Sequence, residues 1–166
     1  AAVCPRAAHV DLRPGLALNL ASVGKGYAVD RLADRLLEHQ VADFVIHGGY
    51  SSVLARGSSW EILPGSAEPL QGWPIGLADP QRKGQRLGEL RLRDAALGTS
   101  GTVFQFFYHR GKRYGHILDP RTGLPGDGVL SVTVFAGSAQ EADALATAFF
   151  VLGPEQSAAV CELRPQ

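Results

Sequence analysis

The sequence predicts an α+β fold in which a mostly antiparallel sheet packs against two main helices. Two segments, one near each end of the chain, carry apolar side chains at helical spacing. Between them lie short β-branched or alternating runs divided by glycine and proline. Because the helices do not alternate with the strands, the order does not fit a strict βαβ repeat. The length of 166 residues favours one domain over residues 1–166.

Composition narrows the classes of function. Basic and acidic residues both number 16, so the formal net charge is zero and no basic field supports nucleic-acid binding as the main activity. No apolar run is long enough to span a membrane, and residues 1–10 lack a signal-peptide core. Cys4 and Cys161 fit neither a zinc site nor a disulfide framework. One bridge between them and two isolated thiols both remain open.

The first predicted elements are an extended segment and a helix. Residues 16–24 read as a strand or extended arm that closes on a turn of small residues. Apolar side chains then recur at helical spacing: Val29, Leu32, Ala33, Leu36 and Leu37. Charged side chains occupy the opposite face: Asp30, Arg31, Asp34, Arg35 and Glu38. This pattern predicts an amphipathic helix with one buried face.

The middle of the chain predicts strands. Residues 41–49 read as a buried strand ending in a glycine turn, and residues 51–57 as its hairpin partner. Four prolines between Trp60 and Gly88 restrict that region to edge strands and loops. Residues 88–101 alternate as one strand, with Leu90 and Leu92 facing inward and Arg91 and Arg93 facing outward.

The C-terminal part predicts a hairpin, a strand and a helix. Residues 102–118 resemble a hairpin that turns at residues 110–112, and residues 130–136 form a β-branched strand. The helix over residues 138–153 begins at Ser138, with Glu141 three residues later as in a capping box.

The first candidate site is Lys25, which stands between Gly24 and Gly26 where the first helix is expected to begin. A glycine-rich turn at a helix N-terminus offers backbone N–H groups to an anion. The spacing is not that of a phosphate-binding P-loop, which needs a glycine further upstream and a serine or threonine after the lysine. On this motif alone, a solvated lysine at a simple helix start is favoured.

The glycine pair after the first buried strand is the second candidate. Gly48 and Gly49 allow a ligand or another backbone to approach closely, and His47 precedes them. An ordinary turn with a hydrogen-bonded histidine explains the same residues.

The segment "YGHILDPRTGLP" concentrates chemistry in a proline- and glycine-framed turn. His116 beside Asp119 has the residue types of a general base and its partner, and Arg121 can neutralise phosphate charge. Thr122 completes the polar set. A turn whose side chains cap the local backbone is an equal alternative.

The second helix contains Asp143 and Thr147, four residues apart and therefore on one face. A carboxylate, a hydroxyl and a backbone carbonyl from elsewhere suit a hard cation such as Mg²⁺. By itself, an aspartate near the helix N-terminus and a threonine bonded to the preceding turn would give the same spacing.

Taken together, six segments resemble the FAD:protein FMN transferase family, also called the ApbE family, in order and spacing. They are "LNLASVGKGYAVD", "DFVIHGGY", "WPIGLADP", "ALGTSG", "YGHILDPRTGLP" and "SVTVFAGSAQEADALATAFFVLG". The resemblance implies an ApbE-like, T-fold-like domain without the family's usual N-terminal portion. It implies transfer of FMN from FAD to a threonine hydroxyl of an acceptor flavoprotein, with release of AMP. Some members mainly hydrolyse FAD to FMN and AMP.

The resemblance also implies roles for individual residues. Mg²⁺ would be held by the Gly24 carbonyl, Asp143 and Thr147. Further residues would line the FAD pocket: Lys25, Gly26, Gly48, Gly49, Ser100 and Thr122. His116 would activate the acceptor hydroxyl, and Asp119 would help to orient the site. The family resemblance places the protein outside the cytoplasm, with membrane tethering only through an N-terminal lipoprotein segment.

Two positions depart from the family pattern. Asn19 stands where an aspartate is usual, in "NLAS" instead of a "DLGG"-like run, and Tyr50 replaces an asparagine after the glycine pair. These departures keep a second interpretation open, in which the chain binds flavin or only holds the fold without catalysis. Metal-dependent release of AMP from FAD discriminates the two.

Overall fold

The computed structural model of the chain describes residues 2–3, 10–59, 71–82, 84–102 and 105–163. The helices are α1 (Ala21–Glu38), α2 (Ala139–Leu152) and α3 (Pro154–Glu162). The strands are β1 (Ala2–Val3), β2 (Val10–Asp11), β3 (Phe44–His47), β4 (Ser52–Arg56), β5 (Trp73–Ala78), β6 (Arg86–Leu92), β7 (Ala95–Gly101), β8 (Phe106–His109), β9 (Lys112–Gly115) and β10 (Ser131–Ala136). The predicted α+β class is confirmed.

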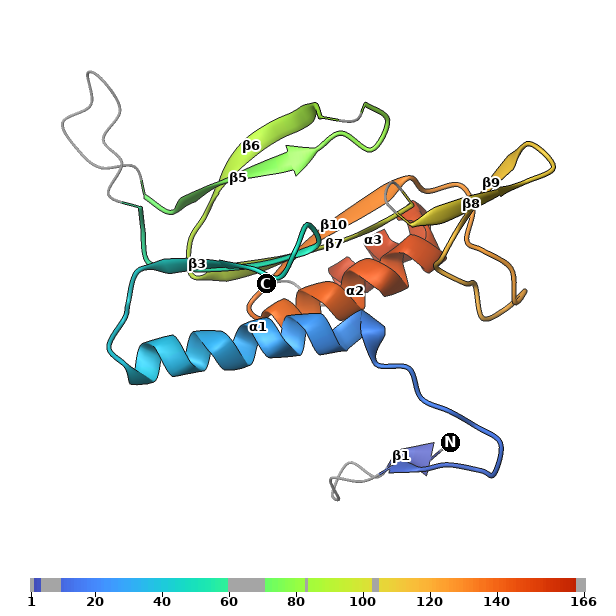
Figure 1. Ribbon diagram of the computed structural model, residues 1–166, viewed down its shortest axis with the longest axis horizontal. Helices are drawn as coiled ribbons and strands as arrows, with labels where there is room; N and C mark the ends of the chain where they lie inside the picture. The colour runs from blue at the N-terminus through green and yellow to red at the C-terminus, as the bar shows by residue number, and fades with distance from the viewer. Residues whose placement is uncertain (1, 4–9, 60–70, 83, 103–104, 164–166) are drawn as a thin grey trace.

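The centre of the fold is a four-stranded antiparallel sheet in the order β10-β7-β4-β3. Helices α1 and α2 cover one face of this sheet and contact each other, and the β5–β6 hairpin lies over the other face (Figure 1). The layers are therefore helices, sheet and hairpin. The predicted hairpin of residues 41–49 with 51–57 is confirmed as β3 and β4.

Strand β4 separates the two halves of the core because its side chains alternate between the faces. Leu54 packs with the helices, in a cluster that includes Val29 and Ala142. Val53 and Ala55 pack instead with the β5–β6 hairpin, in a cluster that includes residues such as Ile75, Leu92 and Leu97. Ser52, at the start of β4, shares the register of Leu54 and therefore belongs to the helix side.

Helix α1 has a narrower apolar face than its sequence predicts. Val29 and Ala33 are buried, and Leu36 packs against the same cluster. Leu32 and Leu37 are 49% and 46% exposed, because only a narrow stripe of the helix faces α2 and the sheet. The helix begins at Ala21, whose N–H donates to the Asn19 side chain at 2.8 Å.

The start of α1 corrects the expected turn of small residues at 16–24. Residues 16–20 form no strand, and Gly24, Lys25 and Gly26 lie inside the helix. Helix propensity disfavours two glycines there. Close packing explains Gly26, because a Cβ at this position would lie 2.3 Å from the Ala139 carbonyl oxygen of α2. Tertiary contact therefore overrides the local preference.

The N-terminus of α2 is capped twice. The predicted cap is confirmed, since Ser138 Oγ accepts from the Glu141 N–H at 3.2 Å. Asp30 of α1 supplies the second cap: its two carboxylate oxygens accept from the N–H groups of Ala139 and Gln140 at 2.8 and 2.9 Å. The assignment of Asp30 to the solvent face is therefore wrong, because helix packing brings its carboxylate to the α2 N-terminus.

We expect Asp30→Ala to lower the free energy of unfolding by about 1–2 kcal/mol, because two N–H groups lose an acceptor and the helix dipole loses a nearby anion. Urea denaturation measures the change. Asp34→Ala is the matched control, since Asp34 is half exposed and pairs with Arg31 on the same helix surface. This variant should lose less than about 0.5 kcal/mol. Equal losses for the two variants would refute the capping role.

Residues 88–101 form two strands instead of the single strand predicted. Leu92 is buried and Leu90 packs with it, so the inward positions are confirmed. The chain then leaves the hairpin at Asp94, whose φ is 48°, and enters the central sheet as β7. The alternation breaks at this corner, where Arg93 and Asp94 are successive charged residues and Leu97 is out of phase with Leu92.

The other predicted elements are confirmed with small changes. β8 and β9 form the expected hairpin, which turns at Arg110 and Gly111. Helix α3 follows α2 directly and is an addition to the two main helices predicted. β5 lies in the region predicted as edge strands and loops, and its pairing with β6 in a hairpin was not predicted. Residues 60–70 of the proline-rich region lie outside the described residues. No helix in the described ranges is long and apolar enough to cross a membrane.

Candidate active site

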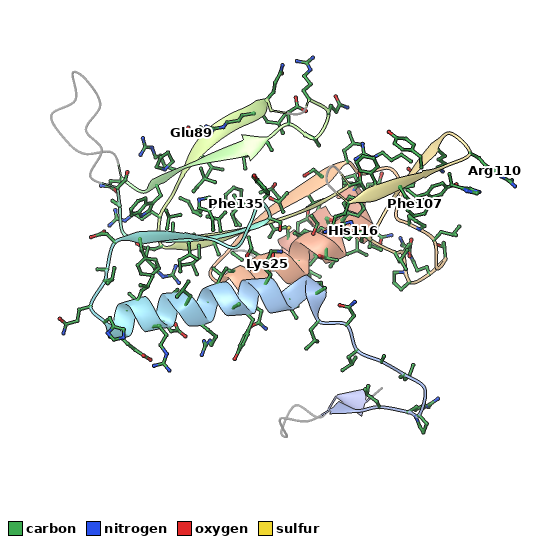
Figure 2. The ribbon with its side chains drawn as sticks, viewed as in Figure 1. Lys25, Glu89, Phe107, Arg110, His116 and Phe135 are labelled. Atoms are coloured by element: carbon green, nitrogen blue, oxygen red, sulfur yellow. The ribbon has the colours of Figure 1, made fainter. Side chains whose placement is uncertain are left out.

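Asp143 is a buried carboxylate on the inner side of α2. Its side chain is 5% exposed, and its Oδ2 lies 3.3 Å from the Nζ atom of Lys25 on α1. Figure 2 shows Lys25 above α1, on the side of that helix that faces α2 and the central sheet. Apart from this ion pair, Oδ2 has no hydrogen-bond partner of good geometry among the described residues. A buried carboxylate with an unused oxygen is costly unless another group binds it.

The surroundings of Asp143 act on it in opposite directions. Burial raises the pKa of the Asp143 carboxyl above its ordinary value, and this effect outweighs the Lys25 ammonium, the Gly26 N–H and the Ser52 hydroxyl, which lower it. Ser52 is fully buried, and its Oγ also lacks a hydrogen bond of good geometry within the described part of the chain. Asp143 Oδ2 and Ser52 Oγ are therefore two buried polar atoms in one small region that both lack a hydrogen bond of good geometry.

Glycines allow the backbones around Asp143 to approach closely. A Cβ on Gly98 of β7 would lie 2.4 Å from the Ala142 carbonyl carbon, next to Asp143. A Cβ on Gly48 would lie 3.4 Å from Lys25 Cγ and 3.5 Å from Ser52 Cβ. Gly49 has a φ of 77° with no atom near its missing side chain, so it is needed for the turn. The structure brings Gly48 to Lys25 and leaves Gly49 facing open space.

Thr147 joins the same region from the next turn of α2. Its hydroxyl donates to the Asp143 carbonyl at 3.2 Å and lies 3.1 Å from Ser100 Oγ on β7. Because the Thr147 proton is used on the carbonyl, Ser100 is the donor to Thr147. This arrangement leaves one lone pair of the Thr147 oxygen available. The predicted residues Lys25, Ser100, Asp143 and Thr147 are therefore connected through two successive turns of α2.

Gly24 lies one residue before Lys25 and is exposed at the N-terminal end of α1. Because it is inside the helix, its carbonyl also has the position of a helix acceptor, and only the second lone pair is available to a cation. Gly26 lies deeper, against α2, and donates its N–H toward Asp143. The two glycines that flank Lys25 therefore differ in their surroundings.

His116 follows β9, near the end of β7. Its Nδ1 lies 3.2 Å from the Gln105 carbonyl oxygen, and the preceding Gly115 lies so close to Thr102 that a Cβ would meet its Cγ2 at 2.4 Å. Thr102 comes two residues after Ser100. The imidazole is exposed (Figure 2). Since a carbonyl only accepts, Nδ1 carries the proton, and in the neutral ring Nε2 holds the free lone pair.

Asp119 and Thr122 stabilise the turn after His116. The Asp119 carboxylate accepts from the Arg121 guanidinium and from the Arg121 N–H, and these bonds hold the pKa of Asp119 below its ordinary value. Arg121 also donates to the Val151 carbonyl at 3.0 Å, which ties the turn to α2. Thr122 Oγ1 accepts from the Leu124 N–H at 3.2 Å. In this structure Arg121 serves the turn, and Asp119 contacts Arg121 instead of the His116 ring.

Ser52 is the residue of this region that sequence reasoning missed. It shares the helix-facing register of β4 with the buried Leu54 and lies three residues after Gly49. A serine at an inward strand position was the available signal. The departures Asn19 and Tyr50 lie elsewhere: the Asn19 side chain accepts from the Ala21 N–H at the start of α1, and Tyr50 is 91% exposed beside Gly49.

The donor set fits a hard divalent cation better than a transition metal. Among the described residues, no three His, Cys, Asp or Glu side chains gather into a cation-binding group. The Asp143 Oδ2 atom, however, is buried without a hydrogen bond, and Thr147 has an unused lone pair. One carboxylate and one hydroxyl match the oxygen ligands and few protein contacts typical of Mg²⁺.

Comparisons with known proteins agree with the fold and these motifs. A protein of Treponema pallidum named "FAD:protein FMN transferase" is 36% identical over 148 residues, which are 88% of this chain and 41% of that protein. A protein of the same name from Klebsiella pneumoniae is 36% identical over 92% of this chain and 44% of its own length. This chain thus spans less than half of these curated relatives.

Solved structures match equally well. The crystal structure of the ApbE protein from Thermotoga maritima superposes with a TM-score of 0.74 at 35% identity, over 88% of this chain and 45% of that one. The flavin transferase ApbE from Vibrio cholerae gives a TM-score of 0.72 at 31% identity, over 91% and 45% of the two chains. The profile of the ApbE family matches residues 4–166. The chain belongs to the ApbE family.

Proposed function

We propose that this chain carries the flavin-transfer site of a Mg²⁺-dependent enzyme that moves FMN from FAD to a threonine hydroxyl of an acceptor protein and releases AMP. The observation that carries the proposal is that Asp143 and Thr147, on successive turns of α2, contact Lys25 and Ser100, and that the buried Asp143 Oδ2 is held only by the ion pair with Lys25 among the described residues. The relatives' name, "FAD:protein FMN transferase", supports the reaction class.

Asp143, Thr147 and the Gly24 carbonyl are the proposed metal ligands. Bound there, Mg²⁺ would act as a Lewis acid that neutralises charge on the pyrophosphate of FAD. The Asp143 carboxylate supplies the negative charge that attracts the ion, and Ser100 fixes the direction of the Thr147 oxygen. Burial of Asp143 keeps competing water from most of its surface.

The remaining proposed residues bind the dinucleotide. Lys25 is 39% exposed, so its ammonium can reach both Asp143 and an anion at the mouth of the site. Gly49 provides backbone without a side chain where a flat ring could approach, and Gly48 makes room for the stem of Lys25. Ser100 and Thr122 would contribute hydroxyls, and Gly26 its close packing against α2.

His116 is the proposed general base. The Gln105 carbonyl fixes its Nδ1 proton, so Nε2 of the neutral exposed ring is free to accept the proton of the attacking hydroxyl. Asp119 would act indirectly, since its bonds to Arg121 rigidify the turn that carries His116 and Thr122. In the full reaction the threonine oxygen forms a bond to the FMN phosphorus, and the bond from that phosphorus to the AMP oxygen breaks.

Two variations of the function share this site. With water as the acceptor, the same groups would hydrolyse FAD to FMN and AMP. Asn19 and Tyr50, which depart from the family pattern, favour a flavin-binding domain without catalysis. We also propose, from the family resemblance, that residues 1–166 form one domain and that this protein lies outside the cytoplasm.

The test is titration of the purified chain with FAD, with and without Mg²⁺, followed by flavin fluorescence and AMP release. A threonine-containing acceptor peptide is added in a parallel series, and its mass is measured. Magnesium-dependent AMP with a peptide heavier by one FMN is the expected result. AMP with an unmodified peptide indicates hydrolysis, and FAD binding without AMP indicates the non-catalytic alternative.

A further inference from the structure

Two cations would compete for the Asp143 carboxylate. In this structure its Oδ2 pairs with the Lys25 ammonium at 3.3 Å, yet the same oxygen is the one proposed to bind Mg²⁺. A carboxylate that is 5% exposed needs a positive partner at all times, because an unpaired buried charge is strongly unfavourable. The two cations would repel each other if both contacted this oxygen.

The position of Lys25 allows its ammonium to move away from the Asp143 carboxylate. Its side chain is 39% exposed while that of Asp143 is 5% exposed, so the ammonium lies at the open end of the contact. Its stem passes beside Gly48, where the missing side chain leaves room for it. A lysine has a long flexible stem and a strongly hydrated head, so it can turn outward into water at small cost.

We propose that Lys25 is an exchangeable counter-ion: its ammonium neutralises Asp143 until a divalent cation binds the carboxylate, and it then turns to the mouth of the site and binds phosphate. This inference rests on the proposed function for the identity of the metal and of the phosphate. Its new content is the role of Lys25 as the occupant that the metal displaces.

The exchange changes the charge of the site. Asp143 and Lys25 together are neutral, and a bound divalent cation gives the same groups two net positive charges. A pyrophosphate diester carries two negative charges at neutral pH, so the metal-loaded site complements it. Metal and dinucleotide should therefore strengthen each other's binding, through a coupling that Lys25 mediates.

Chemical labelling of lysines tests the exchange directly on the wild-type chain. Lys25, Lys83 and Lys112 are the lysines of the sequence, so a brief reaction with acetic anhydride followed by mass spectrometry reports each one. Addition of Mg²⁺ without nucleotide, at constant ionic strength, should increase Lys25 acetylation about 5-fold or more. Lys112 is the internal control, because its partner Asp127 is exposed and unrelated to the site.

Calorimetric titration with Mg²⁺ gives a second, independent readout. Lys25→Met should bind Mg²⁺ about 5-fold or more tightly than wild type, because the competitor for Asp143 is gone. In Lys25→Met, FAD should increase the affinity for Mg²⁺ by a smaller factor than it does in wild type. Asp143→Asn should lose both metal binding and the effect of Mg²⁺ on Lys25 labelling. Circular dichroism checks that each variant is folded.

The outcomes separate this inference from the proposed function. If Mg²⁺ binds through Asp143 while Lys25 labelling and the Lys25→Met affinity stay unchanged, the exchange is wrong and the metal site stands. If wild type binds no Mg²⁺ with or without FAD, the exchange and the proposed metal site are both wrong. Increased Lys25 labelling with tighter binding by Lys25→Met supports the exchange, whatever acceptor the enzyme uses.

Discussion

Asp143→Asn should abolish magnesium-dependent release of AMP from FAD, with a loss of at least about 100-fold. Several kcal/mol of transition-state stabilisation depend on a bound metal, and each 1.36 kcal/mol is about a factor of ten in rate. The amide keeps the size of the carboxylate but lacks the charge that attracts the cation. AMP formation at several Mg²⁺ concentrations measures the effect, and calorimetry should show the metal affinity falling in parallel.

This substitution should leave the fold intact. The Asp143 carboxylate is buried at a cost, shown by its raised pKa, and the Lys25 ammonium is exposed enough to be hydrated once its partner is gone. We therefore expect a change of less than about 1 kcal/mol in the free energy of unfolding. Asp34→Asn, on the exposed face of α1, is the control and should keep full activity. Magnesium-dependent AMP release by Asp143→Asn at the wild-type rate would mean that Asp143 is not a ligand of the metal.

Gly26→Ala should be the most destabilising single-methyl change in α1. The added Cβ would lie 2.3 Å from the carbonyl oxygen of Ala139 and 2.7 Å from the Cα of Gln140, which are backbone atoms that cannot rotate away. Helices α1 and α2 must then separate. We expect a loss of about 2–3 kcal/mol in the free energy of unfolding, or roughly 5–10 °C in the melting temperature.

Gly24→Ala is the matched control, because it adds the same methyl group to the same helix. No atom lies within 4 Å of its missing Cβ, and alanine favours the helix over glycine by about 0.5–1 kcal/mol. The variant should therefore be as stable as wild type or slightly more stable. Thermal denaturation followed by circular dichroism compares the two variants. Similar melting temperatures for both would mean that α1 and α2 do not pack as closely as described.

Much of the fold was predictable because it depends on short-range pattern. The spacing of Val29 and Ala33 predicts α1, Ser138 predicts the start of α2, and the glycine at 111 predicts the turn of the β8–β9 hairpin. Each signal comes from residues a few positions apart, which the backbone geometry of one element already relates. The same holds for Asp143 and Thr147, which one face of a helix places together.

The assignment of strands to sheets was not predictable in this way. Residues 88–101 divide between the β5–β6 hairpin and the central sheet at Asp94, where the successive charges of Arg93 and Asp94 break the alternation without indicating which strands each part pairs with. Alternation reports that one face is buried but not what buries it. Only the packed layers of the fold decide that Leu92 and Leu97, on different sheets, belong to the same cluster.

The sequence by itself determined the elements, the family resemblance and the residue types of the site. The tertiary structure alone decided that Asp30 caps a helix 109 residues away, that Lys25 pairs with Asp143, and that Ser52 lies beside them. The physical reason is that a local pattern fixes directions within one helix or strand. Contacts between elements depend on how their surfaces pack, and here glycines at 26, 48 and 98 let those surfaces come close.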